Sequence, residues 1–181
     1  RVPFFRGLRP NRDRLKALGA AMAATGAVAL FHVEDITPEA RVPFFKKSFS
    51  VDEKETIEIA VSDVNAVFSD IEVNAVAIGC PHLSEDELRT VADLLSGKKV
   101  TKPFFIFVSE EMLNEHRDLV TTIDRTGAHV YADTCMVVSP ATDTLGSVMT
   151  NSGKAFSYLP AMCGVVPRLG TIEECVRVAT E

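Results

Sequence analysis

Short apolar runs alternate with stretches of helical pattern along this chain of 181 residues, and this alternation limits the possible folds more than any other feature. The repeat is roughly 25 to 30 residues long, which is typical of βαβ units. We therefore expect an α/β fold with an open, mostly parallel sheet of about four to five strands and helices on both faces. The predicted strands span residues 27–33, 75–79, 104–108, 129–133 and 147–150.

Helical patterns fill the segments between these runs. Ser84 is followed three residues later by Glu87, a capping-box pattern that predicts a helix over residues 85–95. A short helix is expected to end before Pro160, because proline removes a hydrogen bond inside a helix. The other predicted helices span residues 13–26, 57–68 and 110–125, and a last one begins after Thr171.

The composition is that of an ordinary globular protein, with 46% hydrophobic and 24% charged residues. The length suits one α/β domain, so we expect residues 1–181 to form a single domain. Because the chain starts at Arg1, we also expect it to be a fragment of a larger protein. A net charge of −6 argues against nucleic acid as a partner. The longest apolar run, Gly26 to Val33, is too short to cross a membrane.

Four cysteines occur without any C-x-x-C spacing, which is not the pattern of a disulfide framework. A reduced, cytoplasmic setting is the better expectation for such a chain. Cys163 lies in a turn-like segment and Cys175 lies within an amphipathic helical pattern, so both are interpreted as structural.

Several polar or reactive side chains follow predicted strands. They are Glu39, Cys80, His82, Cys135 and Lys154. Parallel strands end at the same edge of a sheet, and ligands of open α/β sheets bind at that edge. We therefore expect these side chains to share one site. Two thiolates and an imidazole suit zinc or an iron–sulfur cluster, and buried structural cysteines are the alternative.

The segment Asn151-Ser152-Gly153-Lys154 is a glycine-containing turn directly before a predicted helix. Backbone N–H groups at a helix start, together with a lysine, favour a carboxylate or a phosphate. An ordinary turn with a solvated lysine is the alternative. The spacing is not that of a Walker A loop, which makes an NTPase a poor interpretation.

Several short motifs, in this order and over nearly the whole chain, resemble the C-terminal half of the large catalytic part of aconitase X. They are Leu18-Gly19-Ala20-Ala21, His32, Thr37-Pro38-Glu39-Ala40, Gly79-Cys80-Pro81-His82-Leu83-Ser84, Asp133-Thr134-Cys135, Asn151-Ser152-Gly153-Lys154 and Glu173-Glu174-Cys175. The resemblance implies an aconitase-like domain, and a family whose members dehydrate cis-3-hydroxy-L-proline or mevalonate 5-phosphate with an iron–sulfur cluster.

By this resemblance Cys80 and Cys135 are expected to be cluster ligands. Asn151, Ser152, Lys154 and Glu39 are expected to bind a small anionic hydroxy acid, and His82 is expected to be catalytic. The resemblance also implies that an N-terminal half and a small swivelling domain or subunit complete the enzyme. We therefore expect an incomplete cluster site and an inactive fragment.

Three classes of function remain open at this point. The first is part of an iron–sulfur hydro-lyase of the aconitase X type. The second is a zinc site built from Cys80, His82 and Cys135. The third is an α/β binding domain without metal, in which the cysteines are packing residues.

Overall fold

The structure is a computed structural model that describes residues 2–42 and 56–181. The chain divides into two compact units, Arg1–Val67 and Phe68–Glu181. We expected one domain over residues 1–181; the chain has instead a small first unit and a larger second one. The expected α/β architecture is found in the larger unit.

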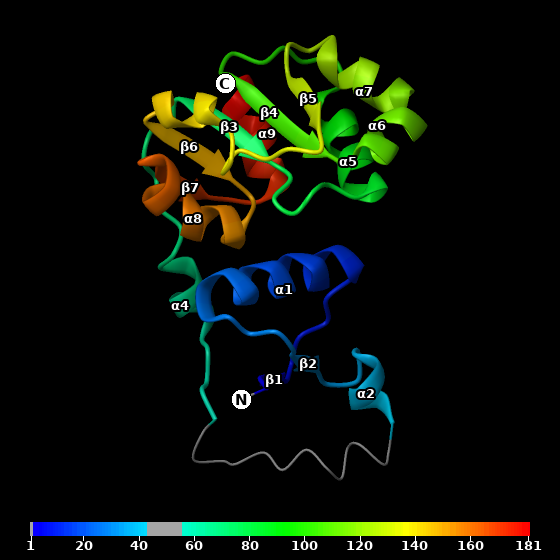
Figure 1. The fold of residues 1–181 in the computed structure, drawn as a ribbon, viewed down its shortest axis with the longest axis vertical. Helices are drawn as coiled ribbons and strands as arrows, with labels where there is room; N and C mark the ends of the chain where they lie inside the picture. Colours follow the sequence, from blue (N-terminus) through cyan, green and yellow to red (C-terminus); the bar gives the residue numbers. More distant parts are fainter. Residues whose placement is uncertain (1, 43–55) are drawn as a thin grey trace. The chain divides into compact units, whose positions relative to one another are not determined.

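The larger unit contains a five-stranded sheet in the order β5-β4-β3-β6-β7, and every pairing in it is parallel (Figure 1). The strands are β3 Ala75–Ile78, β4 Phe104–Val108, β5 His129–Ala132, β6 Ser147–Thr150 and β7 Val166–Leu169. The strands predicted at 75–79, 104–108, 129–133 and 147–150 are confirmed. β7 was not predicted, because Pro167 and Arg168 break its apolar pattern, as an edge strand allows.

Both faces of the central strands are buried. Val76 and Ile78 of β3 point into one core, and Ala75 and Ala77 point into the other. This alternation follows from the two-residue period of a strand. A strand that is buried on both faces needs an uninterrupted apolar run, which is why the sequence of β3 reads as one.

Helices cover both faces of this sheet, as expected. Buried residues of α5, α7 and α9 belong to the core around Val76 and Ile78, and those of α8 belong to the opposite core. The bounds are α5 Glu85–Leu95, α6 Glu110–Glu115, α7 Arg117–Asp124, the 3-10 helix η2 Pro140–Thr144, α8 Gly153–Cys163 and α9 Ile172–Thr180. The predicted helix 110–125 is divided at His116, where φ is −120°. α8 continues through Pro160, so the expected end before this residue was wrong.

The start of α5 is held as the sequence predicts. The hydroxyl of Ser84 accepts the backbone N–H of Glu87 at 3.2 Å, and the carboxylate of Glu87 accepts the N–H of Ser84 at 3.0 Å. This capping box satisfies two N–H groups that a helix start would leave without partners. It also fixes the point at which the chain leaves the loop after β3.

Gly79 ends β3 in a conformation that other residues rarely adopt. Its φ is +100°, and a Cβ atom there would lie 2.3 Å from the carbonyl oxygen of Phe107. Only glycine allows this close approach of the loop to β4. The residue after Gly79 is Cys80, so the glycine determines where this cysteine lies.

The described residues of the smaller unit, 2–42 and 56–67, contain little regular structure. Its elements are β1 Phe4–Phe5, α1 Arg12–Gly26, β2 His32–Val33, α2 Pro38–Arg41 and α4 Val61–Asn65. The helix predicted at 13–26 is confirmed, with Asn11 as its N-cap. The strand predicted at 27–33 is reduced to His32–Val33, which pairs with β1 in a sheet of its own. Leu30 is 53% exposed, so most of this apolar run lacks the burial that a core strand needs.

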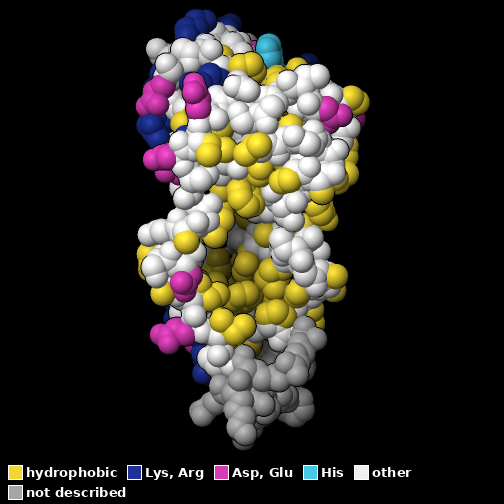
Figure 2. Space-filling model, turned by 90° about the vertical axis from the view of Figure 1, so that its left-hand side faces the viewer, with side chains coloured by type: hydrophobic (Ala, Val, Ile, Leu, Met, Phe, Trp, Pro, Cys, Tyr) yellow, Lys and Arg dark blue, Asp and Glu magenta, His cyan; other side chains and the backbone are white. Residues whose placement is uncertain are grey.

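The helix predicted at 57–68 was also wrong for most of its length. Only Val61–Asn65 is helical, and Ile57, Val61 and Val64 are exposed by 83%, 75% and 49%. The apolar spacing is present, but no described part of the chain covers that face. Without burial of an apolar face, a short helix is marginal. Figure 2 shows one side of the molecule, and hydrophobic side chains are exposed in many places on it.

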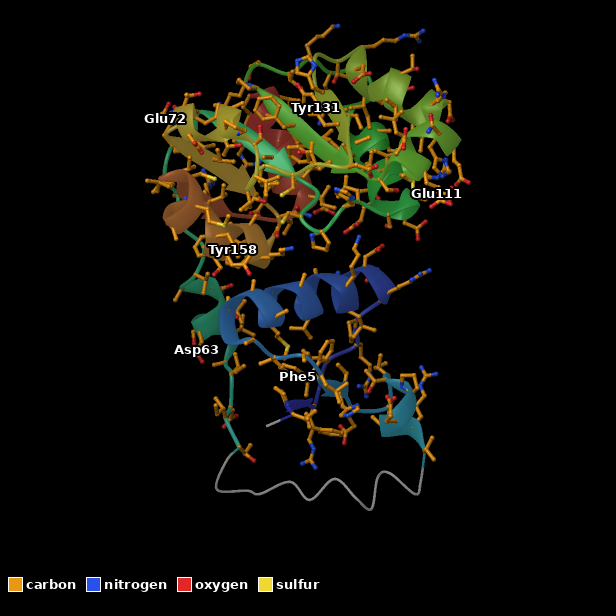
Figure 3. All side chains as sticks on the ribbon, in the orientation of Figure 1. Phe5, Asp63, Glu72, Glu111, Tyr131 and Tyr158 are labelled. Carbon is orange, nitrogen blue, oxygen red and sulfur yellow. The ribbon has the colours of Figure 1, made fainter. Side chains whose placement is uncertain are left out.

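The described part of the smaller unit buries only His32, Val33 and Ala40. The ring of Phe5, labelled in Figure 3, meets that of Phe31 edge to face with centroids 6.1 Å apart. Such a small core contrasts with the two cores of the larger unit. Among the described residues, no helix combines the length and the apolar character that a membrane span requires.

Candidate functional site

The larger unit carries most of the predicted site residues at the carboxyl edge of its sheet. Cys80 and His82 follow β3, Cys135 follows β5, and the Asn151–Lys154 turn follows β6. The strand order changes direction between β3 and β6, since β4 and β5 continue on one side of β3 while β6 and β7 lie on the other. Such a switch point is where ligands of open α/β sheets bind.

The loop after β3 is held against β4 and turns at once into α5. The Cys80–Pro81 peptide bond is cis, and the backbone N–H of Leu83 donates to the carbonyl oxygen of Phe107 at 3.1 Å. Cys80 is only 4% exposed and belongs to the core beneath α8. The loop therefore presents a buried thiol at the end of the central strand.

The loop after β5 is anchored to the same neighbour, β4. Asp133 has a φ of +52°, its N–H donates to the carbonyl of Val108 at 3.0 Å, and its carboxylate accepts the N–H of Glu110 at 3.0 Å. The following loop carries Cys135, which is half-buried and packs against the same core as Cys80. The sequence placed Asp133 at a strand end and in a family motif, but it did not predict that this carboxylate would anchor the loop.

A side chain joins the two cysteine loops. Nε2 of His82 lies 2.8 Å from the carbonyl oxygen of Thr134, the residue directly before Cys135. Because a carbonyl oxygen only accepts hydrogen bonds, Nε2 carries the hydrogen. The imidazole predicted to be catalytic therefore donates the hydrogen of this nitrogen to the backbone of the neighbouring loop.

Ser152 connects the β3 loop to α8. Its hydroxyl accepts the N–H of Ala155 at 2.9 Å as the N-cap of α8, and it donates to the carbonyl oxygen of Cys80. The side chain is buried, and the one hydrogen of its hydroxyl is used. In the structure this hydroxyl holds the Cys80 loop, and the expected role of Ser152 in substrate binding stays a prediction.

Lys154 lies in the first turn of α8, and both it and Asn151 are half-buried. Lysine in this place adds a positive charge to a helix start that already favours anions. Tyr158, one turn further along α8 and labelled in Figure 3, packs against the core that contains Cys80. The start of α8 is thus close to Cys80, whose carbonyl oxygen accepts the hydroxyl of Ser152.

The pKa of the Cys80 thiol depends on its burial and on the groups close to it. Burial raises the pKa of its thiol above the ordinary value, and the neighbouring Cys135 raises it further. Lys154 and Ser152 act in the opposite direction. The structure thus brings together Cys80, Cys135, Ser152 and Lys154. A buried thiol with a raised pKa stays protonated unless a metal or a cation takes the place of the proton.

Glu39 lies in the smaller unit, in the short helix α2. Its carboxylate is 3.8 Å from Nδ1 of the buried His32, and its side chain is half exposed. Its expected part in substrate binding stays a prediction.

The two remaining cysteines are buried in cores. Cys175 of α9 is fully buried among apolar side chains, and burial raises the pKa of its thiol. The thiol of Cys163 lies 3.4 Å from the carbonyl oxygen of Val137, and burial and Asp143 raise its pKa. Both positions agree with the structural role expected for these cysteines.

The donor set can be tested against the two expected metals. No group of three or more His, Cys, Asp or Glu side chains that could hold a metal ion occurs among the described residues. A zinc site made of Cys80, His82 and Cys135 is therefore not formed by residues 56–181. Two neighbouring thiols at one edge do fit part of an iron–sulfur ligand set, because thiolates are the usual ligands of such clusters.

A pocket of about 280 Å³ lies in another part of the larger unit, between the ends of β6 and β7 and the start of α9. None of the predicted site residues lines it. Its Arg168 is paired with Asp70 at 2.8 Å, and its Glu174 accepts the N–H of Thr171 at 2.8 Å. Its charged groups are thus used in local structure.

The larger unit is therefore a doubly wound α/β domain with a two-thiol site at the carboxyl edge of its sheet. Family models identify both parts of the chain: the aconitase X second domain matches residues 1–69, and the aconitase X third domain matches residues 73–181. The chain belongs to the aconitase X family. The resemblance to this family that its motifs indicated is confirmed.

Curated relatives and a solved structure agree with this family assignment. The phosphomevalonate dehydratase large subunit of Methanosarcina mazei is 47% identical over 183 residues, which are 99% of this chain and 45% of the relative. The cis-3-hydroxy-L-proline dehydratase of Hypocrea jecorina is 30% identical, over 100% of this chain and 33% of the relative. The crystal structure of Thermococcus kodakaraensis aconitase X in its holo-form superposes with a TM-score of 0.85 at 36% identity, covering 98% of this chain and 47% of that one. The chain spans less than half the length of these proteins.

Proposed function

We propose that this chain is part of a hydro-lyase that removes water from a small, anionic hydroxy acid. The observation that carries the proposal is the meeting of two thiols, Cys80 and Cys135, with the Lys154 ammonium at the carboxyl edge of the sheet. The relatives support the reaction class, since they are named as dehydratases.

The more specific proposal is dehydration of mevalonate 5-phosphate. The relative with that activity in its name is 47% identical to this chain, against 30% for the cis-3-hydroxy-L-proline dehydratase. Its name also designates a large subunit, so we propose that a small subunit and further residues of the large one complete the enzyme. The free thiols of all four cysteines favour a cytoplasmic setting.

The proposed cofactor is an iron–sulfur cluster with Cys80 and Cys135 among its ligands. Such clusters are held by about three or four protein ligands, so further ligands would come from outside these two loops. When bound, the cluster supplies a Lewis-acidic iron that polarises the leaving hydroxyl.

The residues of this chain then hold and orient the substrate. The Lys154 ammonium and the N–H groups at the start of α8 would bind its carboxylate or phosphate, with the Asn151 amide beside them. Ser152 keeps this helix start next to Cys80. Fixing the anion beside the thiols allows elimination in one geometry only, which lowers the entropic part of the barrier. Glu39 stays a proposed substrate-binding residue.

The proposal is tested on the full-length protein, purified anaerobically with its small subunit. We expect a brown protein that contains iron and sulfide and that eliminates water from mevalonate 5-phosphate faster than from cis-3-hydroxy-L-proline. Cys80→Ser and Cys135→Ser should lose iron and activity together, while Cys163→Ser, a matched control in the same core, should keep both. A colourless protein with stoichiometric zinc would support the zinc alternative. Full activity in both ligand variants would support a domain without metal.

A further inference from the structure

The thiols of Cys80 and Cys135 interact with each other, and the side chain of His82 makes a second link between the two cysteine loops. His82 lies two residues after Cys80, and its Nε2 donates across to the carbonyl oxygen of Thr134 at 2.8 Å, one residue before Cys135. The two partners are separated by 52 positions in the chain. This hydrogen bond therefore links the two loops close to both cysteines.

Each loop is also attached to β4, and Ser152 holds the β3 loop to the start of α8. The β3 loop is attached by the N–H of Leu83 to Phe107, and the β5 loop by the N–H of Asp133 to Val108. These anchors determine where each loop leaves the sheet. None of these backbone anchors runs from one loop to the other, whereas the bond between His82 and Thr134 does, so this bond bears directly on the separation of Cys80 and Cys135.

The hydrogen bond also limits what the imidazole can do. Nε2 must carry its hydrogen to donate to Thr134, so this nitrogen is not available to accept a proton from a substrate. A side chain that is half-buried between two loops is suited to holding them. We propose that His82 is a positioning residue that sets the separation of Cys80 and Cys135, in place of the catalytic role expected from the sequence. This proposal rests on the proposed function of the two thiols.

The separation of the thiols can be measured without any cluster. Phenylarsine oxide forms two As–S bonds with a pair of close thiols and releases one water, which needs no oxidant or reductant. The probe is applied to the metal-free full-length protein with its small subunit, and peptide mapping by mass spectrometry identifies arsenic that bridges Cys80 and Cys135. Iron and sulfide content after anaerobic reconstitution is measured on the same variants.

Three substitutions separate the hydrogen bond from the ring. His82→Ala removes both, His82→Phe keeps the ring without the donor, and His82→Gln keeps an N–H near the place of Nε2 without the ring. We expect His82→Ala and His82→Phe to slow the bridging about tenfold and to lower the iron content in parallel, because losing one part-buried hydrogen bond shifts a loop equilibrium by about that factor. His82→Gln should restore both values close to those of the unaltered protein.

The outcomes discriminate between the roles. Equal loss in His82→Gln and His82→Ala would overturn the proposal, because the ring itself would then be required. Unchanged bridging and iron content in all three variants would overturn it too. If bridging follows the predicted order but the unaltered protein never binds iron, the positioning role holds and the proposed cofactor is wrong. Circular dichroism and the Tm confirm that each variant is folded before the comparison.

Discussion

The hydroxyl of Ser152 donates to the carbonyl oxygen of Cys80 and at the same time accepts the N–H of Ala155. One buried side chain thus begins α8 and holds the loop after β3, although 72 positions separate the two partners. The start of α8 and the loop that carries the buried thiol are therefore held together by one side chain.

This double role predicts a large effect of Ser152→Ala. The substitution removes an N-cap, worth about 1 kcal/mol, and leaves a buried carbonyl without its donor, which costs about 1 to 3 kcal/mol more. Thr171→Ala is the matched control, because Thr171 caps α9 through Glu174 and holds no second loop. Denaturant unfolding should show a clearly larger loss for Ser152→Ala. Equal losses would mean that the bond to Cys80 contributes nothing.

Gly79→Ala should disrupt the site and the sheet. The new Cβ would lie 2.3 Å from the backbone oxygen of Phe107, and the left-handed φ adds about 1 kcal/mol of strain. We expect the free energy of unfolding to fall by about 3 kcal/mol or more, a loss typical of clashes or cavities in a protein core. Gly97→Ala is the control, since its φ is also positive, at +71°, but nothing lies within 4 Å of the added atom. A similar cost for both would show that the contact with β4 relaxes easily.

Lys154→Met should weaken substrate binding in the complete enzyme. It keeps an unbranched side chain that is one atom shorter and removes the charge that favours an anion at the start of α8. We expect KM to rise about tenfold or more, the effect of losing roughly 1.4 kcal/mol of charge-assisted binding. Lys102→Met is a control on another part of the larger unit, where the ammonium donates to the carbonyl of Val178 at 3.4 Å. Equal KM values in Lys154→Met and the unaltered enzyme would remove the anion site from the proposal.

Cys175 should make the folded state sensitive to alkaline pH. Burial raises the pKa of this thiol, so the folded state keeps the proton at a pH at which the unfolded state has lost it. Its contribution to stability is fully present below the ordinary thiol pKa and is lost as the pH rises from there towards the raised value. Unfolding free energies measured across alkaline pH should fall less steeply for Cys175→Ala than for the unaltered protein. Parallel curves would contradict this.

Residues 1–181 expressed alone should fold but bind no stable cluster and show no dehydratase activity. Two cysteine ligands hold a cluster poorly, and an open site leaves water in contact with it. Reconstitution with iron and sulfide, visible absorption and assays with both substrates check this. Co-expression with the rest of the large subunit and the small subunit should restore cluster and activity. Stable absorption and turnover by the fragment alone would place a missing ligand within these residues.

Sequence patterns correctly predicted those helices and strands that are specified by residues close together in the chain. β4 begins directly after Pro103 and ends before Ser109. Its residues Phe104–Val108 are all apolar, so exposing them to water would be unfavourable. α5 has its capping box within four residues. The parallel arrangement followed from the alternation of such elements, because a parallel sheet needs a crossover between its strands. The common edge for Cys80, Cys135 and Lys154 followed from that arrangement.

Apolar spacing failed where burial depends on distant parts of the chain. Residues 27–33 and 57–68 have the patterns of a core strand and an amphipathic helix, but the described residues leave most of these side chains exposed. α8 shows the reverse, because its contacts with β7 and η2 stabilise a helix that continues through Pro160. Pattern predicts an element only when a partner surface covers it.

The sequence by itself determined the family, the parallel α/β architecture and the residue types at the edge of the sheet, because period, caps and short motifs are properties of neighbouring residues. Only the tertiary structure decided that Ser152 holds the Cys80 loop and that His82 holds Thr134. Each of those hydrogen bonds joins residues more than 50 positions apart, at 72 and 52 positions. Hydroxyl and imidazole groups can bind a substrate or the backbone with similar chemistry, and the choice is made by which partner the fold brings within hydrogen-bonding distance.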